Sequence, residues 1–297
     1  MDDIIKNKKI AILGSSPVMI ILFYFLKLKN EVIIFEENKV LGGAWKQQKY
    51  KKTFINLHSN VVLPGNKKIY NRQIKINTIL KKKKIGIKIK KSDKKIFALY
   101  KPRKYFEYDF SNMYKKVLKY SQNIKHDKIK KITYLENNQI KLNDNQIFDL
   151  VFFPSYFGIN HFFYKKKKIK IDFKIIQSLH LSLITNKISQ KLIYSDFYNQ
   201  YFDRINMHKF KEFFHLTARV SKTLKKSKLK IIKEKFTKTF PNIEIKKIIL
   251  NKYKNYYRDK YQLDNLKKKL YQKKITYVNT TSFLAGINQI INLDRKY

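Results

Sequence analysis

Three residues near the N-terminus have the types and the spacing of a site for a nucleotide diphosphate. Gly14 and Ser16 follow the apolar run 9–13, and the carboxylate of Glu36 comes 22 positions after Gly14. Glycine lets the backbone approach a ligand closely, and the start of the helix that follows attracts an anion. A carboxylate about 20 residues beyond the first glycine can accept both hydroxyl groups of a ribose. The spacing therefore predicts a dinucleotide site.

A parallel strand–helix–strand unit must hold these residues in place. Residues 9–13 and 31–35 are short apolar runs of the kind that a parallel sheet buries on both faces. The residues between them fit one helix, and Pro17 stands in its first turn, where the missing N–H costs nothing. The Gly-x-Gly-x-x-Gly pattern is incomplete, because Ser16 and Met19 replace its second and third glycines. A strand–helix–strand unit without a ligand is therefore the alternative.

A second glycine motif follows Glu36. Residues 41–45 read Leu-Gly-Gly-Ala-Trp and hold the only tryptophan of the chain. Together with Gly-Ser-Ser-Pro at 14–17, this motif resembles FAD-binding flavoproteins with two dinucleotide-binding domains, the group of amine oxidases, protoporphyrinogen oxidases and UDP-galactopyranose mutases. The resemblance implies FAD as the cofactor, or else NAD(P), and it implies a Gly-Gly loop close to the pyrophosphate. The cofactor-binding residues would be Gly14, Ser16, Pro17, Glu36, Gly42, Gly43, Ala44 and Trp45.

The same resemblance gives a role to the C-terminal segment. In the family, the last strand and helix aim a helix start at the flavin, and residues 275–278 and 283–293 fit these two elements. Thr281 and Ser282 would then lie at the cofactor. The Gly-Asp pair that precedes this helix in the family is replaced here by Asn-Thr at 279–280.

Two residues are candidates for the substrate side. Phe202-Asp203-Arg204 resembles the strand that carries an arginine toward the substrate in these flavoproteins, so Arg204 would anchor an anionic substrate. The alternative is a surface arginine paired with Asp203. His58 is the titratable group in a predicted loop near the flavin, or else an ordinary loop histidine. The sequence names no catalytic residue, since it has no Gly-x-Ser-x-Gly motif and no P-loop.

The expected fold class is α/β, a Rossmann-like FAD/NAD(P)-binding domain with an inserted, mixed β-rich substrate domain. Residues 1–60, 125–160 and 272–297 would form the discontinuous cofactor domain, and residues 61–124 and 161–271 the substrate domain. Within this frame the local patterns predict helices over 18–29, 222–235 and 263–271. They also predict several strands within 129–155 and separate strands over 245–250 and 253–258.

Composition excludes several kinds of chemistry. The chain has no cysteine, which rules out disulfides, thiolate chemistry and cysteine-ligated metal, and no His/Glu cluster has metal spacing, so no metal site is predicted. The net charge of +46 comes from 61 lysines and only six arginines. Because base and phosphate recognition favours arginine, this balance indicates a compositional bias and no specific nucleic-acid partner.

The uncharged stretch 10–26 resembles a membrane segment. It is, however, interrupted by Gly-Ser-Ser-Pro and is shorter than the ~20 residues of a membrane span, so no transmembrane segment is expected. We expect a cytoplasmic protein and leave its oligomeric state open.

The function that these patterns favour is an FAD-dependent oxidoreductase of amine-oxidase or UDP-galactopyranose-mutase type. Its substrate would be a small molecule, with an anionic one as a candidate. Two alternatives remain from the sequence. One is a non-catalytic protein that keeps a degenerate flavoprotein fold, and the other is a basic protein that binds polyanions or membrane surfaces.

Overall fold

A five-stranded parallel sheet gathers segments that lie far apart in the sequence. The computed structural model describes residues 5–57, 61–62, 66–98, 101–143, 145–154, 158–159, 161–164, 167–170, 174–188, 194–195, 200–209, 211–224, 227–241, 243–257, 275–278, 280 and 283–296. The sheet order is β20-β12-β1-β2-β8, with strands β1 Lys9–Leu13, β2 Glu31–Phe35, β8 Ile124–Lys125, β12 Leu150–Pro154 and β20 Ile275–Val278. All of its pairings are parallel. The predicted fold class, α/β with a Rossmann-like sheet, is confirmed.

Alternating side chains of this sheet enter two different cores. Ile10 and Ile12 of β1 pack with the helices α1 Pro17–Leu26, α3 Ser111–Val117 and α6 Phe283–Lys296. Ala11 and Leu13 face the other way, into a core shared with a second sheet. Both faces of the parallel sheet are therefore covered, and this explains why its strands are apolar throughout.

The second sheet has the order β11-β10-β9-β13-β14. Its strands are β9 Lys131–Tyr134, β10 Ile140–Leu142, β11 Gln146–Phe148, β13 His161–Tyr164 and β14 Lys167–Lys170. The chain thus makes an excursion through β9, β10 and β11 and returns to the parallel sheet at β12. The structure confirms several strands within 129–155.

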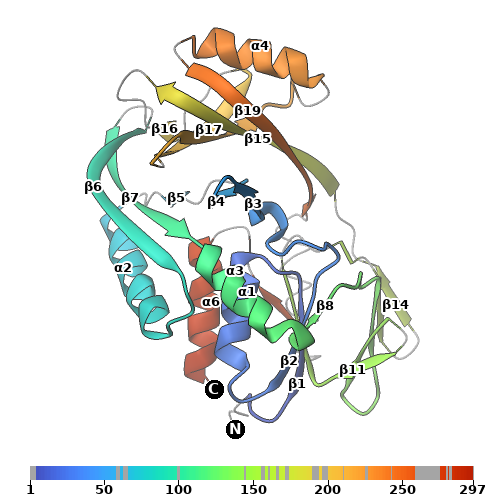
Figure 1. The fold of residues 1–297 in the computed structure, drawn as a ribbon. Helices are drawn as coiled ribbons and strands as arrows, with labels where there is room; N and C mark the ends of the chain where they lie inside the picture. Colours follow the sequence, from blue (N-terminus) through green and yellow to red (C-terminus); the bar gives the residue numbers. More distant parts are fainter. Residues whose placement is uncertain are drawn as a thin grey trace.

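Helix α1 is buried because it lies between the parallel sheet and other helices. Nine of its ten residues are buried, and it packs beside α3 and α6 (Figure 1). A helix that is apolar on all sides requires such a position. The uncharged stretch 10–26 therefore forms a strand and a core helix. Within the described parts of the chain, no helix combines the length and the apolar character needed to cross a membrane.

The remaining elements form two more sheets, of which one packs on the helices beside the parallel sheet and the other lies at the far end of the molecule in Figure 1. One sheet has the order β16-β6-β7-β5, with β5 Val61–Val62, β6 Lys88–Ala98, β7 Lys101–Asp109 and β16 Tyr194–Ser195, and helix α2 Lys67–Lys82 lies beside it. Another, which we call the cap sheet, has the order β17-β18-β15-β19, with β15 Lys174–Ile188, β17 Phe202–Lys209, β18 Phe214–Val220 and β19 Ile243–Tyr257. Helix α4 Leu229–Thr239 packs on its outer side.

A hairpin and two short 3-10 helices complete the fold. The hairpin pairs β3 Gln47–Tyr50 with β4 Thr53–Asn56 and lies between the cap sheet and the parallel sheet (Figure 1). The 3-10 helices are η1 Gly43–Trp45 and η2 Leu118–Asn123. This arrangement places the 41–45 motif between the parallel sheet and the cap sheet.

Two local predictions need correction. The two strands predicted over 245–250 and 253–258 are one continuous strand, β19, because a second long strand, β15, pairs along its length. The helix predicted over 222–235 begins at Leu229 instead. The helix predicted over 263–271 lies outside the described residues. Helix α2 was not predicted, because its lysine-rich sequence hides the few buried positions on one of its faces.

The first turn of α2 offers a stability test. The side chain of Asn66 caps this helix, since its Oδ1 accepts a hydrogen bond from the backbone N–H of Ile69 at 2.9 Å. Asn66→Ala leaves that N–H without its side-chain partner and should lower the free energy of unfolding by about 1 kcal/mol in urea denaturation. Lys67→Ala, at the exposed next position, should cause no loss because alanine favours helices. Equal losses in the two variants would contradict the capping role.

Candidate functional site

The turn after β1 has the geometry that an anion site requires. Gly14 has φ +87°, and its N–H donates to the carbonyl oxygen of Phe35 at 2.6 Å, which joins the ends of β1 and β2. Ser16 is the N-cap residue of α1, but its side chain makes no capping hydrogen bond. Its Oγ is buried and has no hydrogen-bond partner. A buried hydroxyl without a partner at a helix start, on the carboxyl edge of a parallel sheet, is the arrangement expected of a ligand site.

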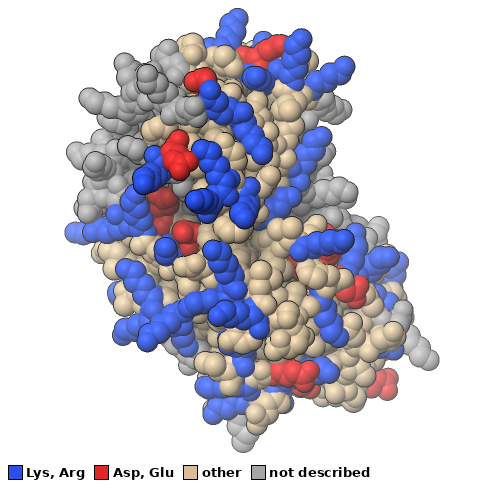
Figure 2. Space-filling model, viewed as in Figure 1, with Lys and Arg blue, Asp and Glu red and all other residues tan. Residues whose placement is uncertain are grey.

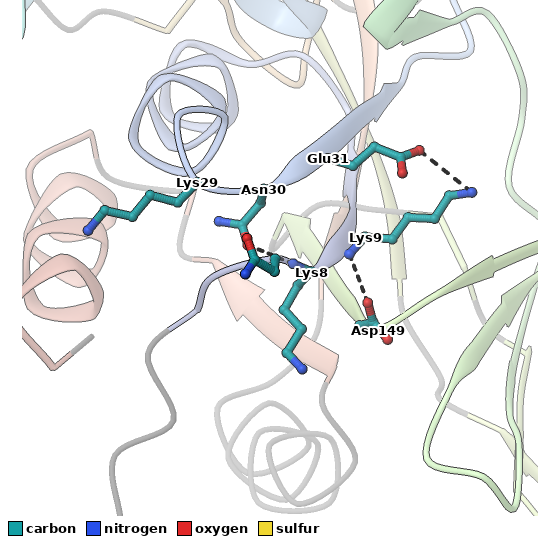
Figure 3. A pocket seen from close by; sticks show the side chains of 7 residues that line it. Lys8, Lys9, Lys29, Asn30, Glu31 and Asp149 are labelled. Carbon is teal, nitrogen blue, oxygen red and sulfur yellow. Dashed lines mark hydrogen bonds and ion pairs between the residues drawn. The ribbon is translucent and has the colours of Figure 1, made fainter.

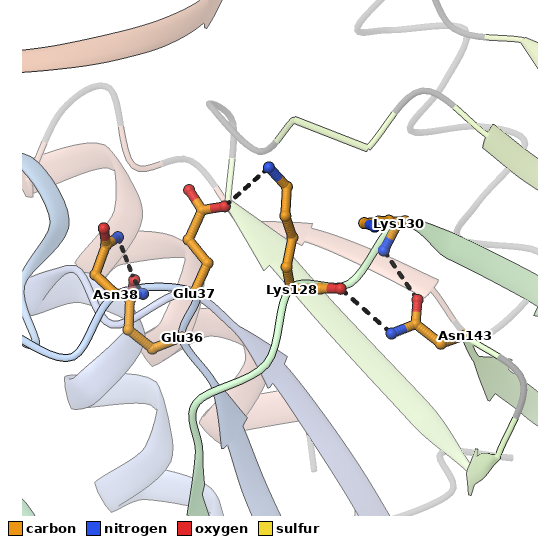
Figure 4. Close-up of polar contacts among 6 residues, drawn as sticks. All are labelled: Glu36, Glu37, Asn38, Lys128, Lys130 and Asn143. Carbon is orange, nitrogen blue, oxygen red and sulfur yellow. Dashed lines mark hydrogen bonds and ion pairs between the residues drawn. The ribbon is translucent and has the colours of Figure 1, made fainter.

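The carboxylate of Glu36 is fully engaged by the protein itself. Its Oε2 accepts hydrogen bonds from Ser15 N at 3.0 Å and Ser15 Oγ at 2.5 Å. Its Oε1 accepts hydrogen bonds from Asn38 N at 3.0 Å and Asn38 Nδ2 at 2.7 Å (Figure 4). Only 4% of Glu36 is exposed. Four donors fill the roughly four acceptor positions of a carboxylate, so Glu36 ties the β1 turn to the loop after β2.

The two glycines of the 41–45 motif differ in their surroundings. Gly42 has φ +112°, and its N–H donates to Ser15 Oγ at 2.8 Å. A Cβ on Gly42 would lie 2.8 Å from the Cα of Lys46, so the backbone would have to shift to accept it. Gly43 has φ +54°, and a Cβ there would meet nothing within 4 Å. The fold therefore needs a glycine at 42, whereas position 43 borders open space.

The rest of the motif contacts both the core around α1 and the cap sheet. Trp45 packs edge-on against Phe110, with ring centroids 5.8 Å apart. The carbonyl oxygen of Ala44 lies 3.4 Å from Asn251 Nδ2 of the cap sheet. The loop that follows Gly42 is thus held from both sides.

Sequence reasoning missed Tyr114 and the roles of Ser15 and Asn38. The hydroxyl of Tyr114, on α3, is buried without a hydrogen-bond partner, and it would be 3.1 Å from a Cβ on Gly42. Burial, and secondly the charge of Glu36, raise the pKa of this hydroxyl well above its ordinary value, so it stays a hydrogen-bond donor. Tyr114 is far from the glycine motifs in sequence, and nothing in its local pattern marks it. Ser15 and Asn38 adjoin predicted residues, so a search of their neighbours could have found them.

Three of the other predicted site residues, His58, Thr281 and Ser282, lie outside the described residues. Pro17 is the first residue of α1, as predicted. Arg204 lies on β17 at an irregularity in the pairing with β18, between Asp203 and Asn206. The side chain of Arg204 is also outside the described part, so its role stays a prediction.

A separate shallow pocket lies at the opposite end of the parallel strands (Figure 3). It is lined by Asn7, Lys8, Lys9, Lys29, Asn30, Glu31 and Asp149. Much of its polar surface is paired internally: Lys9 Nζ lies 3.6 Å from Glu31, and Lys9 N donates to Asp149 at 2.8 Å. Ligands of parallel sheets bind at the carboxyl edge, so this pocket is not part of the predicted dinucleotide site.

Neither the charged groups on the face drawn in Figure 2 nor the described His, Asp and Glu side chains form a second candidate site. Figure 2 shows lysines and arginines spread over both halves of the visible face, with fewer acidic residues among them. Among the residues that the structure describes, no group of three His, Asp or Glu side chains could hold a metal ion.

Comparison with solved structures identifies the fold. An Exiguobacterium sp. 255-15 protein provisionally assigned as a protoporphyrinogen oxidase matches with a TM-score of 0.67 and 8% identity, over 98% of this chain and 99% of that one. Putrescine oxidase bound to putrescine matches with a TM-score of 0.61 and 7% identity, over 98% and 97%. An FAD-dependent oxidoreductase from Pseudomonas aeruginosa matches with a TM-score of 0.59 and 9% identity, over 98% and 89%.

These likenesses confirm the expected fold, that of FAD-dependent oxidoreductases of the amine-oxidase type. No family model matches the sequence, and neither does any curated protein. Because their sequence identity to this chain is only 7–9%, these solved structures are evidence for the fold alone.

Proposed function

We propose that the chain is an FAD-dependent oxidoreductase that acts on a small molecule. The observation that supports this most is the buried, unpaired Oγ of Ser16 at the start of α1, in a chain with the fold of flavin oxidoreductases. In this proposal residues 1–60, 125–160 and 272–297 form the cofactor domain, and residues 61–124 and 161–271 form the substrate domain.

The residues at the β1 turn fit the diphosphate part of FAD. Gly14 places no side chain at the start of α1, and the free space beside Gly43 leaves room for the cofactor. The hydroxyls of Ser16 and Tyr114 are buried donors without partners, and phosphate oxygens are strong acceptors. These groups would hold and orient the diphosphate. The flavin, when bound, supplies the acceptor for the electron pair of the substrate.

The ribose part of FAD fits less simply. Glu36 would accept the ribose hydroxyls, yet its acceptor positions are taken by Ser15 and Asn38. Asn38 is exposed whereas Ser15 is buried, so the two contacts of Asn38 are the ones that ribose hydroxyls would replace. The exchange keeps the number of hydrogen bonds to Glu36 and costs little net free energy.

The purified chain tests this proposal directly. After incubation with FAD and desalting, the protein should keep a flavin absorption band that bleaches with dithionite. FAD should also raise the melting temperature, because a ligand at 100 times its Kd adds about 2.7 kcal/mol to the folded state. A colourless protein whose melting temperature FAD does not change would refute the proposal.

Two observations favour a second candidate, a non-catalytic protein that keeps the fold without FAD. Met19 replaces the third glycine of the motif and is completely buried, and Glu36 is already saturated by the protein's own donors. Both features stabilise the turn in the absence of a nucleotide. The colourless outcome of the same experiment would support this candidate.

A further inference from the structure

The cap sheet has a polar face that is buried. Leu179, Leu181 and Leu183 of β15 point toward α4 and form an apolar core with it. The alternate residues of the sheet point the other way. They include the buried polar side chains Ser178, His180, Ser182, His215, Thr217 and Asn251, which we call the polar face. An antiparallel sheet usually turns its polar face to water, so a polar face that is 9% exposed or less calls for an explanation.

The polar face looks toward the loop that follows Gly42. Asn251 Nδ2 lies 3.4 Å from the carbonyl oxygens of Ala44 and Leu57. Figure 1 shows the hairpin β3–β4 directly beneath the cap sheet, on the side away from α4. Ile184, on the same side of β15, packs with Ile55 and Leu57. The polar face of the cap sheet is therefore covered by the hairpin and by the proposed cofactor loop.

Two atoms of the polar face lack hydrogen-bond partners. Thr217 Oγ1 and Asn251 Oδ1 are both buried and unpaired, on residues that are 1% exposed. Beside Thr217, a hydrogen bond joins Ser182 Oγ and His215 Nε2. Buried polar atoms are rarely left unpaired in folded proteins, since each loses its water without compensation. The two orphaned atoms thus point to a ligand that pairs them.

The chemistry of the two atoms restricts that ligand. Asn251 Oδ1 only accepts hydrogen bonds, whereas Thr217 Oγ1 both donates and accepts. A carboxylate or phosphate offers acceptors alone and cannot pair with Asn251 Oδ1. An ammonium group offers donors, but the buried polar side chains that the structure describes on this face include no carboxylate to balance its charge. Hydroxyl groups are uncharged, and one hydroxyl can pair with either atom. The two atoms lie on β18 and β19 with β15 between them, so a ligand that pairs both needs more than one hydroxyl.

We propose that the polar face binds an uncharged, hydroxyl-bearing small molecule against the Gly42–Trp45 loop. The inference rests on the proposed function in treating this ligand as the substrate of the flavin. The binding itself follows from the cap sheet alone. It differs from the putrescine seen in one solved structure of the same fold, because putrescine is a dication.

Three probes on one four-carbon skeleton test the charge preference. Butanediol, putrescine and succinate carry two hydroxyls, two ammonium groups and two carboxylates, and ligand-observed NMR titration of the full chain gives a Kd for each. Binding of such small molecules is weak. Butanediol should bind at least about tenfold more tightly than the other two, since only it pairs the orphaned atoms without burying a charge. Equal or tighter binding of putrescine or succinate, or no butanediol binding, would overturn the proposal.

Substitutions at two similar threonines locate the site. Thr217→Val removes the hydroxyl at constant shape and should weaken butanediol binding about fivefold, whereas Thr217→Ser should restore it. Thr185→Val is the matched control. Thr185 Oγ1 is equally buried and unpaired, but Thr185 pairs with Phe214 on the α4 side of the cap sheet. Butanediol affinity that is unchanged in Thr217→Val, or that falls equally in Thr185→Val, would rule out the polar face as the site.

The same titrations separate this inference from the proposed function. They are run with and without FAD, and the flavin absorption of each sample is recorded. A chain that binds butanediol through Thr217 but retains no flavin would refute the oxidoreductase and keep the polar-face site. A chain that retains flavin but shows no preference for butanediol would keep the proposed oxidoreductase and refute the polar-face site.

Discussion

Replacing Gly42 by alanine should lower the free energy of unfolding by about 3 kcal/mol or more, because the backbone strain and the steric overlap add. The φ of +112° lies where side chains are rarely accepted, and the new Cβ would be 2.8 Å from Lys46 Cα and 3.1 Å from the hydroxyl of Tyr114. The backbone at Lys46 cannot move freely, since its N–H donates a hydrogen bond to the carbonyl oxygen of Gly43 and its carbonyl oxygen accepts one from the N–H of Leu57. Urea denaturation with a fixed m-value measures the loss.

Gly43→Ala is the control next to it. Its φ of +54° costs an alanine about 1 kcal/mol, and the added Cβ meets no atom within 4 Å. The stability of the chain without FAD should therefore fall much less than in Gly42→Ala. If the flavin occupies the open space, Gly43→Ala should nevertheless weaken FAD binding. Equal losses of stability in the two variants would contradict the assigned difference between the glycines, and unchanged FAD affinity would place the cofactor elsewhere.

Glu36→Ala should be the second strongly destabilising change, by about 3–5 kcal/mol. The substitution leaves the buried N–H and hydroxyl of Ser15 and the N–H of Asn38 without their acceptor. It also frees Ser15, whose oxygen accepts the N–H of Gly42. One carboxylate thus holds together the β1 turn, the loop after β2 and the Gly42 loop.

The neighbouring residue Glu37 is a matched control. It carries the same side chain on the next position, but it is 49% exposed and makes only an ion pair with Lys128, at 3.4 Å (Figure 4). Surface ion pairs contribute about 0–1 kcal/mol, so Glu37→Ala should change the stability little. Urea denaturation of both variants compares them. A loss in Glu36→Ala no larger than that in Glu37→Ala would show that the four contacts of Glu36 do not hold the turn.

The predictions of local structure succeeded where burial on both faces leaves an apolar run. The runs at 9–13, 31–35 and 275–278 are strands with the predicted bounds. Prediction missed α2 and divided β19 into two strands. In both, lysines alternate with a few apolar residues, so a buried face on one side is hard to recognise, and the length of β19 depends on its partner β15.

The candidate site, like the fold, was predictable from the sequence only in part. Glycine is scarce in this chain, so the positions of Gly14 and of the 42–43 pair mark turns that need positive φ, and local conformation alone requires them. The sequence also indicates a carboxylate at 36, at the end of an apolar strand.

Tertiary structure alone decided what these residues contact. Ser15, Asn38 and Tyr114 converge on Glu36 and Gly42 from separate segments, and the polar face draws on residues between 178 and 251. Hydrogen bonding and burial depend on which distant segments fold against one another, and such distances are not encoded in local spacing. The sequence therefore determined the turns and the strands of the parallel sheet, whereas the pairing of buried polar atoms, and the atoms left unpaired, followed from packing.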